Sequence, residues 1–173
     1  NASRFALMHI TDKDTQIDNK KLNLAEKWIL SRSAHTSLAV KEGIETYRFN
    51  EAASAVYQFV WHEFCDWFLE ITKPSLYEKE GVQRRDSTRR VLSKVLEDIL
   101  IMLHPFMPFV TEEIYHILPT TNGSIMAATY PYNETEYATY RNEAVEKQMD
   151  FIFGLISGVR NIRSEMNIQP SMK

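Results

Sequence analysis

The sequence is poor in the residues on which redox, metal and nucleotide chemistry usually depend. One cysteine among 173 residues, Cys65, excludes an intramolecular disulfide and suits a reducing cytoplasm. Only five glycines are present, and none belongs to a phosphate-binding loop. The apolar runs are short and carry charges, so no membrane span or signal peptide is visible. What remains is the composition of a soluble globular protein, 44% apolar and 25% charged.

Catalytic motifs are also missing, and two partial matches do not complete one. Residues 62–66, His-Glu-Phe-Cys-Asp, resemble a zinc-protease helix, but Asp66 stands where a second histidine is required. Residues 113–116, Glu-Ile-Tyr-His, match one unit of a di-iron bundle, which needs a second such unit and two further glutamates. We therefore predict no catalytic residue and no metal site, and a di-iron carboxylate enzyme is the least favoured alternative.

Helical periodicity dominates the chain and predicts an all-α fold, an antiparallel bundle of about five main helices. In the best-defined helix, apolar residues recur at steps of three and four, which places them on one face. The expected helices span about residues 22–47, 50–72, 86–103 and 141–164, with a short helix near Ser3.

Helix ends are predicted from capping residues and prolines. Asn50 is the expected N-cap of the second long helix, and Pro74 is expected to bar its continuation. After prolines 105 and 108, Thr111 is expected to cap a short helix. Residues 119–140 show little helical pattern.

The net charge of −3 argues mildly against nucleic-acid binding, but some cations are clustered. Four of them surround one predicted helix start: Arg84, Arg85, Arg89 and Arg90. The helix dipole disfavours cations there, so anions should compensate them. The favoured source is the protein itself, through Glu78, Glu80, Asp86 or acids on neighbouring helices, and the alternative is an RNA phosphate.

Arg4 and Trp28 form a second candidate site, in which Trp28 lies beside Lys27 and near Arg32 in the sequence. Unstacked RNA bases bind on aromatic and guanidinium planes. Trp28 is also spaced four residues from Leu24, as core partners on one helix face are. Both interpretations stay open, and an accessible indole would favour base stacking.

Six segments carry a family resemblance that spans nearly the whole chain in order. They are residues 1–5, 63–70, 84–92, 103–115, 124–127 and 160–167. Together they resemble the anticodon-binding domain of class I aminoacyl-tRNA synthetases. The segments 84–92 and 103–115 are shared by the isoleucyl, leucyl and valyl enzymes. The segments 63–70, 124–127 and 160–167 are most similar to the valyl enzymes.

The resemblance implies a domain that recognises the anticodon of valine tRNA. Its parent enzyme would join valine to that tRNA with ATP and magnesium, and would hydrolyse mischarged threonine in a separate editing domain. This chain would be a non-catalytic fragment without cofactors, acting in the cytoplasm as part of a monomer, with no DNA or membrane partner. Residues 1–140 would form the anticodon-binding bundle. Residues 141–173 would form a helix leading to a further tRNA-contacting region.

Residue by residue, the family analogy concerns the first two helices and the end of the third. Arg4 would face the anticodon loop, Trp28 would occupy the aromatic position of the second helix, and Lys73 would neighbour the same surface. Lys27 would add positive charge beside Trp28. The alternative function is that of a helical protein-interaction module without RNA binding. An exposed apolar patch would support it.

Overall fold

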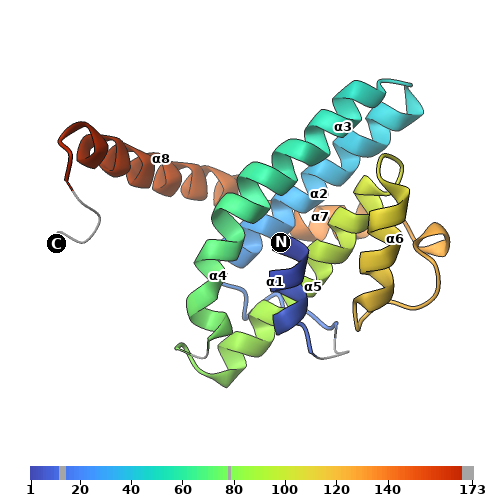
Figure 1. Cartoon of the computed structure of the whole chain (residues 1–173), viewed down its shortest axis with the longest axis horizontal. Helices are drawn as coiled ribbons and strands as arrows, with labels where there is room; N and C mark the ends of the chain where they lie inside the picture. Colours follow the sequence, from blue (N-terminus) through green and yellow to red (C-terminus); the bar gives the residue numbers. More distant parts are fainter. Residues whose placement is uncertain (12–14, 78, 169–173) are drawn as a thin grey trace.

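A computed structural model describes residues 1–11, 15–77 and 79–168, and over these residues the chain forms helices and no strand (Figure 1). The predicted all-α bundle is therefore confirmed. In chain order the helices are α1 (Ala2–His9), α2 (Leu24–Glu45), α3 (Phe49–Gln58), the π-helix η1 (Phe59–Phe68), α4 (Leu69–Leu76), α5 (Val82–Leu103), α6 (Pro108–Ile117), the short 3-10 helix η2 (Ile125–Ala127), α7 (Glu134–Tyr140) and α8 (Glu143–Glu165). None of the described helices is long and apolar enough to cross a membrane.

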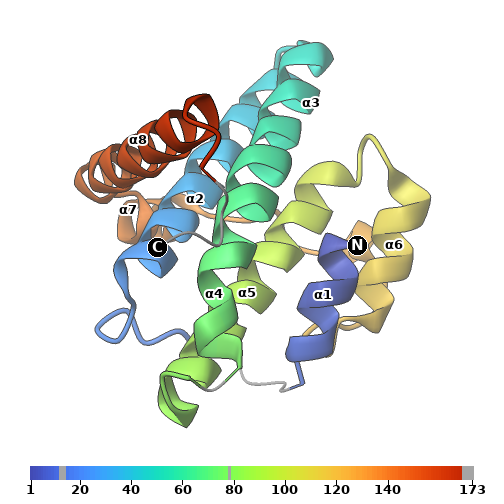
Figure 2. The same ribbon diagram turned by 60° about the vertical axis from the view of Figure 1, so that its left-hand side comes forward.

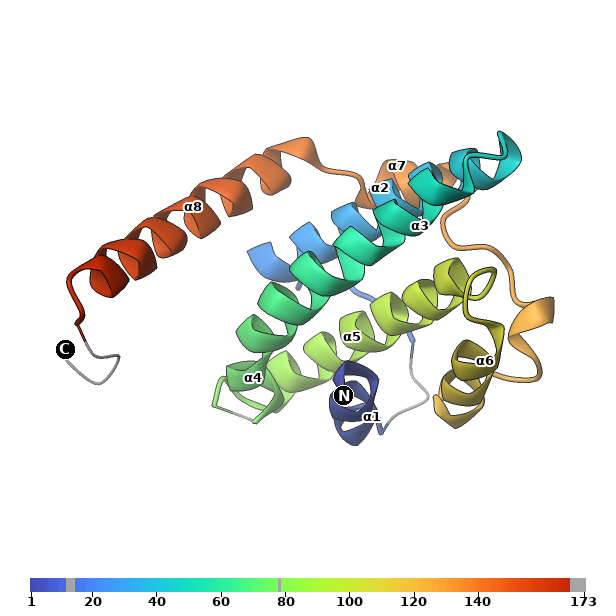
Figure 3. The same ribbon diagram turned by 45° about the horizontal axis from the view of Figure 1, so that its top comes forward.

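Three long antiparallel stretches form the body of the bundle: α2, the continuous run α3–η1–α4, and α5 (Figure 3). The first turn between them is tight because Gly43 is buried against α3. A Cβ at Gly43 would lie 2.9 Å from the Cβ of Ala52, so a larger residue would push the two helices apart. The short helix α1 packs on α5 at one side of this body (Figure 2).

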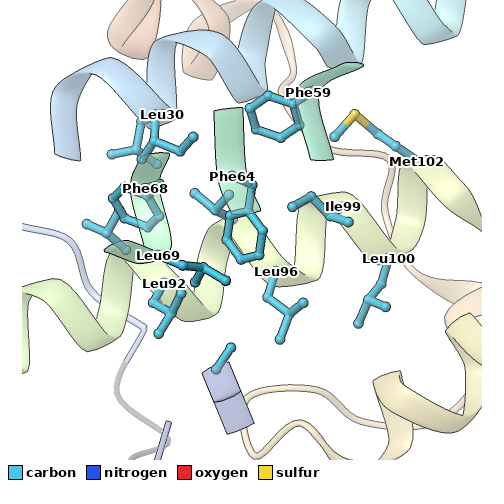
Figure 4. Packing of buried hydrophobic residues seen from close by; sticks show 14 of the residues in the cluster. Leu30, Phe59, Phe64, Phe68, Leu69, Leu92, Leu96, Ile99, Leu100 and Met102 are labelled. Carbon is cyan, nitrogen blue, oxygen red and sulfur yellow. The ribbon is translucent and has the colours of Figure 1, made fainter. Parts of the chain in front are cut away.

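The π-helix explains why three phenylalanines share one side of the middle stretch. Phe59, Phe64 and Phe68 are fully buried, and Figure 4 shows them between α2 and α5, near Leu30 and Leu96. A step of five residues would rotate Phe64 away from Phe59 in an α-helix, whereas the wider π turn brings residues five apart together. Burying each of these rings contributes roughly 1.5–3 kcal/mol.

Three predicted helix boundaries are wrong. The middle stretch begins at Phe49, with Arg48 as N-cap, because the Arg48 guanidinium binds Glu51 at 2.9 Å in the first turn; Asn50 lies inside the helix. Pro74 lies inside α4, since a proline removes only its own N–H and Tyr77 N still bonds Lys73 O at 3.0 Å. The third concerns Thr111.

Thr111 does not cap α6, because that helix already begins at Pro108. Proline suits the first helical position, where its missing N–H costs nothing. The Thr111 hydroxyl instead donates to Met107 O at 2.8 Å. A further helix, α7, lies in the stretch that showed little pattern. Its signal was present in the sequence, because Asn133 and Glu136 form a capping box.

Candidate nucleic-acid interface

The arginine run lies in the first turns of α5, where its first member is committed to a buried carboxylate. Glu26 on α2 is 1% exposed and forms an ion pair with the Arg84 guanidinium. Thr88 Oγ1 also donates to Glu26 Oε1 at 2.7 Å, and the backbone N–H of Asn23 donates to Glu26 Oε2 at 3.0 Å. Arg84 therefore joins the starts of α2 and α5, and the interpretation as internal pairing holds for this residue.

The next members of the run also find protein carboxylates. Arg85 Nε lies 3.0 Å from Asp86 Oδ1, and Arg89 Nη1 lies 4.0 Å from the same atom. Arg85, Arg89 and Arg90 border a hollow of about 200 Å³ together with Thr11. Glu80, another expected partner, accepts a hydrogen bond from Ser75 Oγ at 2.6 Å. Glu78 lies outside the described residues.

Lys73 at the end of α4 lies close to Phe5, the residue that follows Arg4 in α1. Arg4 is exposed on α1 and forms no ion pair with another described residue. The Lys73 ammonium lies 5.9 Å from the centre of the Phe5 ring and 2.5 Å from Glu70 Oε1. The end of α4 and the first turn of α1 thus present cations and an aromatic ring on one edge of the bundle.

Trp28 is a core residue in this structure. Its side chain is 2% exposed, and its ring meets Phe153 of α8 edge-on at 5.0 Å. The accessible indole that base stacking would require is therefore not found. Lys27 next to it is exposed and borders a separate hollow of about 190 Å³ with Tyr140 and Asn142. The structure does not gather Lys27 and Trp28 into one basic–aromatic platform.

A charged cluster at the base of α8 was not anticipated from the sequence. Arg32 on α2 binds Glu63 of η1 through two hydrogen bonds of 2.7 and 2.8 Å, and its Nη1 lies 3.5 Å from Glu146 of α8. The two bonds to Glu63 raise the pKa of Arg32. Glu146 also pairs with Arg141.

The positive charges of this cluster also affect the pKa of His35. Partial burial, together with the charges of Arg32 and Arg141, lowers the pKa of His35 below its usual value of 6.5. The cluster could not be read from sequence periodicity, because Arg32 is 31 residues from Glu63 and 114 residues from Glu146. Glu63 alone stood in a segment that carries the family resemblance.

The two partial metal motifs form ordinary helix-surface pairs. His62 Nδ1 lies 3.4 Å from Asp66, and His116 Nε2 lies 2.9 Å from Glu112, each at a spacing of four residues. Within the described ranges, no group of three or more His, Cys, Asp or Glu side chains could hold a metal ion.

Comparison with known families decides among the remaining interpretations. A model of the anticodon-binding domain of tRNA ligases matches residues 26–173. The chain belongs to this family. The all-helical fold described above is consistent with that membership.

The curated relatives narrow the family to one kind of ligase. The chain is 44% identical over its whole length to a valine–tRNA ligase of Desulfotalea psychrophila and 45% identical over its whole length to that of Syntrophotalea carbinolica. It is also 45% identical, over 99% of its length, to the valine–tRNA ligase of Geobacter sulfurreducens. It spans 19 to 20% of the length of these relatives. Along its whole length, the chain is thus similar to one part of these valine–tRNA ligases.

Proposed function

We propose that this domain recognises the anticodon of valine tRNA on behalf of an enzyme that ligates valine to that tRNA. The observation that carries the proposal is the similarity to valine–tRNA ligases along the entire chain, together with the matching anticodon-binding domain. The domain supplies binding and orientation, and the bond-forming chemistry belongs to other parts of the enzyme.

The edge formed by α1 and the end of α4 is the proposed anticodon-facing surface. Arg4 is exposed there, and the Phe5 ring and Lys73 lie beside it. A guanidinium can stack on an unpaired base or bind a phosphate through two N–H groups, and a lysine contributes a mobile positive charge. Lys27 contributes long-range electrostatic attraction. Trp28 packs against α8 in the core and receives no role in RNA binding.

The arginines of α5 receive a different role in this proposal. Arg84 stabilises the bundle through Glu26. A secondary phosphate contact is assigned to the hollow that Thr11 borders together with Arg85, Arg89 and Arg90. That contact is secondary, because Asp86 already neutralises part of their charge.

We assign ATP and magnesium to other parts of the full-length ligase. The described residues contain no metal-binding group of side chains, and the sequence has no glycine-rich phosphate loop. We place the enzyme in the cytoplasm as a monomer. We keep the division into a bundle over residues 1–140 and a helical connection over residues 141–173.

Titration of the 173-residue domain with valine tRNA and isoleucine tRNA tests the proposal. Fluorescence anisotropy at several salt concentrations should give tighter binding to valine tRNA, with an affinity that falls steeply as salt rises. Equal affinity for both tRNAs would refute anticodon recognition by this domain. Absence of binding at low salt would favour the alternative, a protein-interaction module.

A further inference from the structure

One face of α8 contacts the bundle, and its buried residues lie in the first half of the helix. Phe153 stacks on Trp67 at 4.1 Å and meets Trp28 at 5.0 Å, and the Arg160 guanidinium lies 5.3 Å from the centre of the Trp67 ring. Met149, one turn before Phe153, is buried. These contacts define the inward side of α8.

The opposite side of α8 is apolar and uncovered. Large side chains recur there at steps of four and three residues, which places them along one stripe of a helix. The stripe consists of Phe151 (68% exposed), Leu155 (55%), Val159 (57%), Ile162 (57%) and Met166 (68%). In Figures 1 and 3 this part of α8 projects away from the other helices. A stripe of this length is unusual on the surface of a soluble protein unless something covers it.

Two glycines beside the stripe point to a close contact. Gly154 and Gly158 are one turn apart, and a Cβ added to either would meet no atom within 4 Å. Glycine weakens a helix interior relative to alanine, so an exposed helix gains nothing from it. Nothing in the described structure requires either glycine. A surface that packs directly against the α8 backbone would require both.

The base of α8 is fixed so that the stripe faces outward. Glu146 accepts a hydrogen bond from Ser31 Oγ and forms ion pairs with Arg32 and Arg141. The backbone N–H of Asn142 donates to Ser31 Oγ at 2.7 Å. Arg32 also binds Glu63, so η1, α2 and α8 share one cluster. The bundle therefore holds α8 in a defined direction.

We propose that the outward stripe of α8 is an intramolecular docking surface for an apolar polypeptide segment of the full-length ligase, outside these 173 residues. The relatives that match the whole chain are about five times longer, so such segments are abundant in the same molecule. Four of the five stripe residues are neither aromatic nor charged, which fits protein better than RNA, because RNA binds cations and aromatic platforms. The proposal uses the ligase membership of the chain and is independent of tRNA binding.

Thiol labelling tests which surface of α8 is covered. Leu155→Cys lies in the stripe, and Ser164→Cys is a matched control at an exposed position on the same helix, away from the stripe. In the full-length ligase without tRNA, maleimide should label position 155 about tenfold more slowly than position 164, because a covered thiol reacts only after local opening. In the 173-residue domain the two positions should react at similar rates.

Three outcomes would overturn the proposal. Equal labelling of both positions in the full-length ligase would show that the stripe stays open. Protection of position 155 in the 173-residue domain, with elution as a dimer, would make a second copy the occupant. Protection that appears only when tRNA is added would make RNA the occupant.

Gly158→Ala gives a second test. It should not destabilise the 173-residue domain, and it should open the docked surface in the full-length ligase. In the 173-residue domain the substitution should leave the thermal midpoint unchanged or raise it, because alanine favours the helix and meets open space. In the full-length ligase it should increase maleimide labelling at Leu155→Cys several-fold, because the added methyl group separates the docked surfaces. Unchanged labelling in the full-length ligase would contradict close packing at Gly158.

Discussion

The basic run on α5 and the basic edge beside α1 differ in what their cations bind. Arg84 pairs with Glu26, whose carboxylate is buried, and Arg85 lies against Asp86. Arg4 is exposed on α1 and has no carboxylate partner among the described residues. Arg84 and Arg85 of the cluster on α5 are thus bound by carboxylates of the protein. The isolated Arg4 is more available to RNA.

This difference teaches that the partner of a cation matters more than the number of its cationic neighbours. A buried carboxylate without a cation costs several kcal/mol, so the pair that satisfies it is part of the fold. An exposed arginine costs the protein little and can bind a phosphate or a base. The two regions should therefore respond in opposite ways to substitution.

The largest expected effect is on stability, at Arg84. Arg84→Ala should lower the free energy of unfolding by about 3 kcal/mol, because Glu26 would keep a buried charge without its cation. Urea unfolding followed by circular dichroism measures this. Adding Glu26→Gln should recover part of the loss, since a neutral amide needs no cation. A loss below about 0.5 kcal/mol would mean that Arg84 is not structural.

The next effect is on RNA affinity, at Arg4. Arg4→Ala should weaken binding to valine tRNA about tenfold, or roughly 1.4 kcal/mol, while the unfolding free energy stays within about 0.5 kcal/mol. Arg4→Lys is the matched control, because it keeps the charge and loses the planar guanidinium. Anisotropy titrations of the three proteins compare them. Unchanged affinity in Arg4→Ala would remove this residue from the interface.

A smaller effect is expected at Asp86, which pairs with two arginines of the run. Asp86→Asn should cost less than about 1 kcal/mol of stability, because the pairs are partly exposed. If the run bound RNA, the substitution would raise the affinity, because it removes a negative charge beside Arg85 and Arg89. We expect the affinity for valine tRNA to change less than about twofold. A rise of fivefold or more would assign the run to the RNA interface.

The smallest effect concerns pH and the internal arginine cluster at the base of α8. His35 has a lowered pKa in the folded domain, so the unfolded chain binds its proton more readily. Stability should therefore fall as the pH drops below about 6.5 and towards the folded pKa. His35→Gln should flatten this dependence in urea titrations. His9, whose pKa is also lowered, contributes with the same sign and remains in the variant. An unchanged slope would contradict a lowered pKa of His35, which partial burial and then the charges of Arg32 and Arg141 produce.

The sequence allowed the fold class and the family to be predicted, because both depend on patterns that are local or that recur along the chain. The helix at residues 134–140 begins with a capping box, which is a local sequence pattern and could have been predicted. The switch to a π-helix at Phe59–Phe68 could not be predicted, since burial between α2 and α5 selects it. The pairing of Arg84 with Glu26 and the burial of Trp28 depend on contacts between distant segments, which no local spacing encodes.

Transplanting the valine anticodon into isoleucine tRNA tests the central claim most directly. If this domain reads the anticodon, the chimeric tRNA should bind nearly as tightly as valine tRNA, and Arg4→Ala should abolish the gain. A chimeric tRNA that binds no better than isoleucine tRNA would contradict the account.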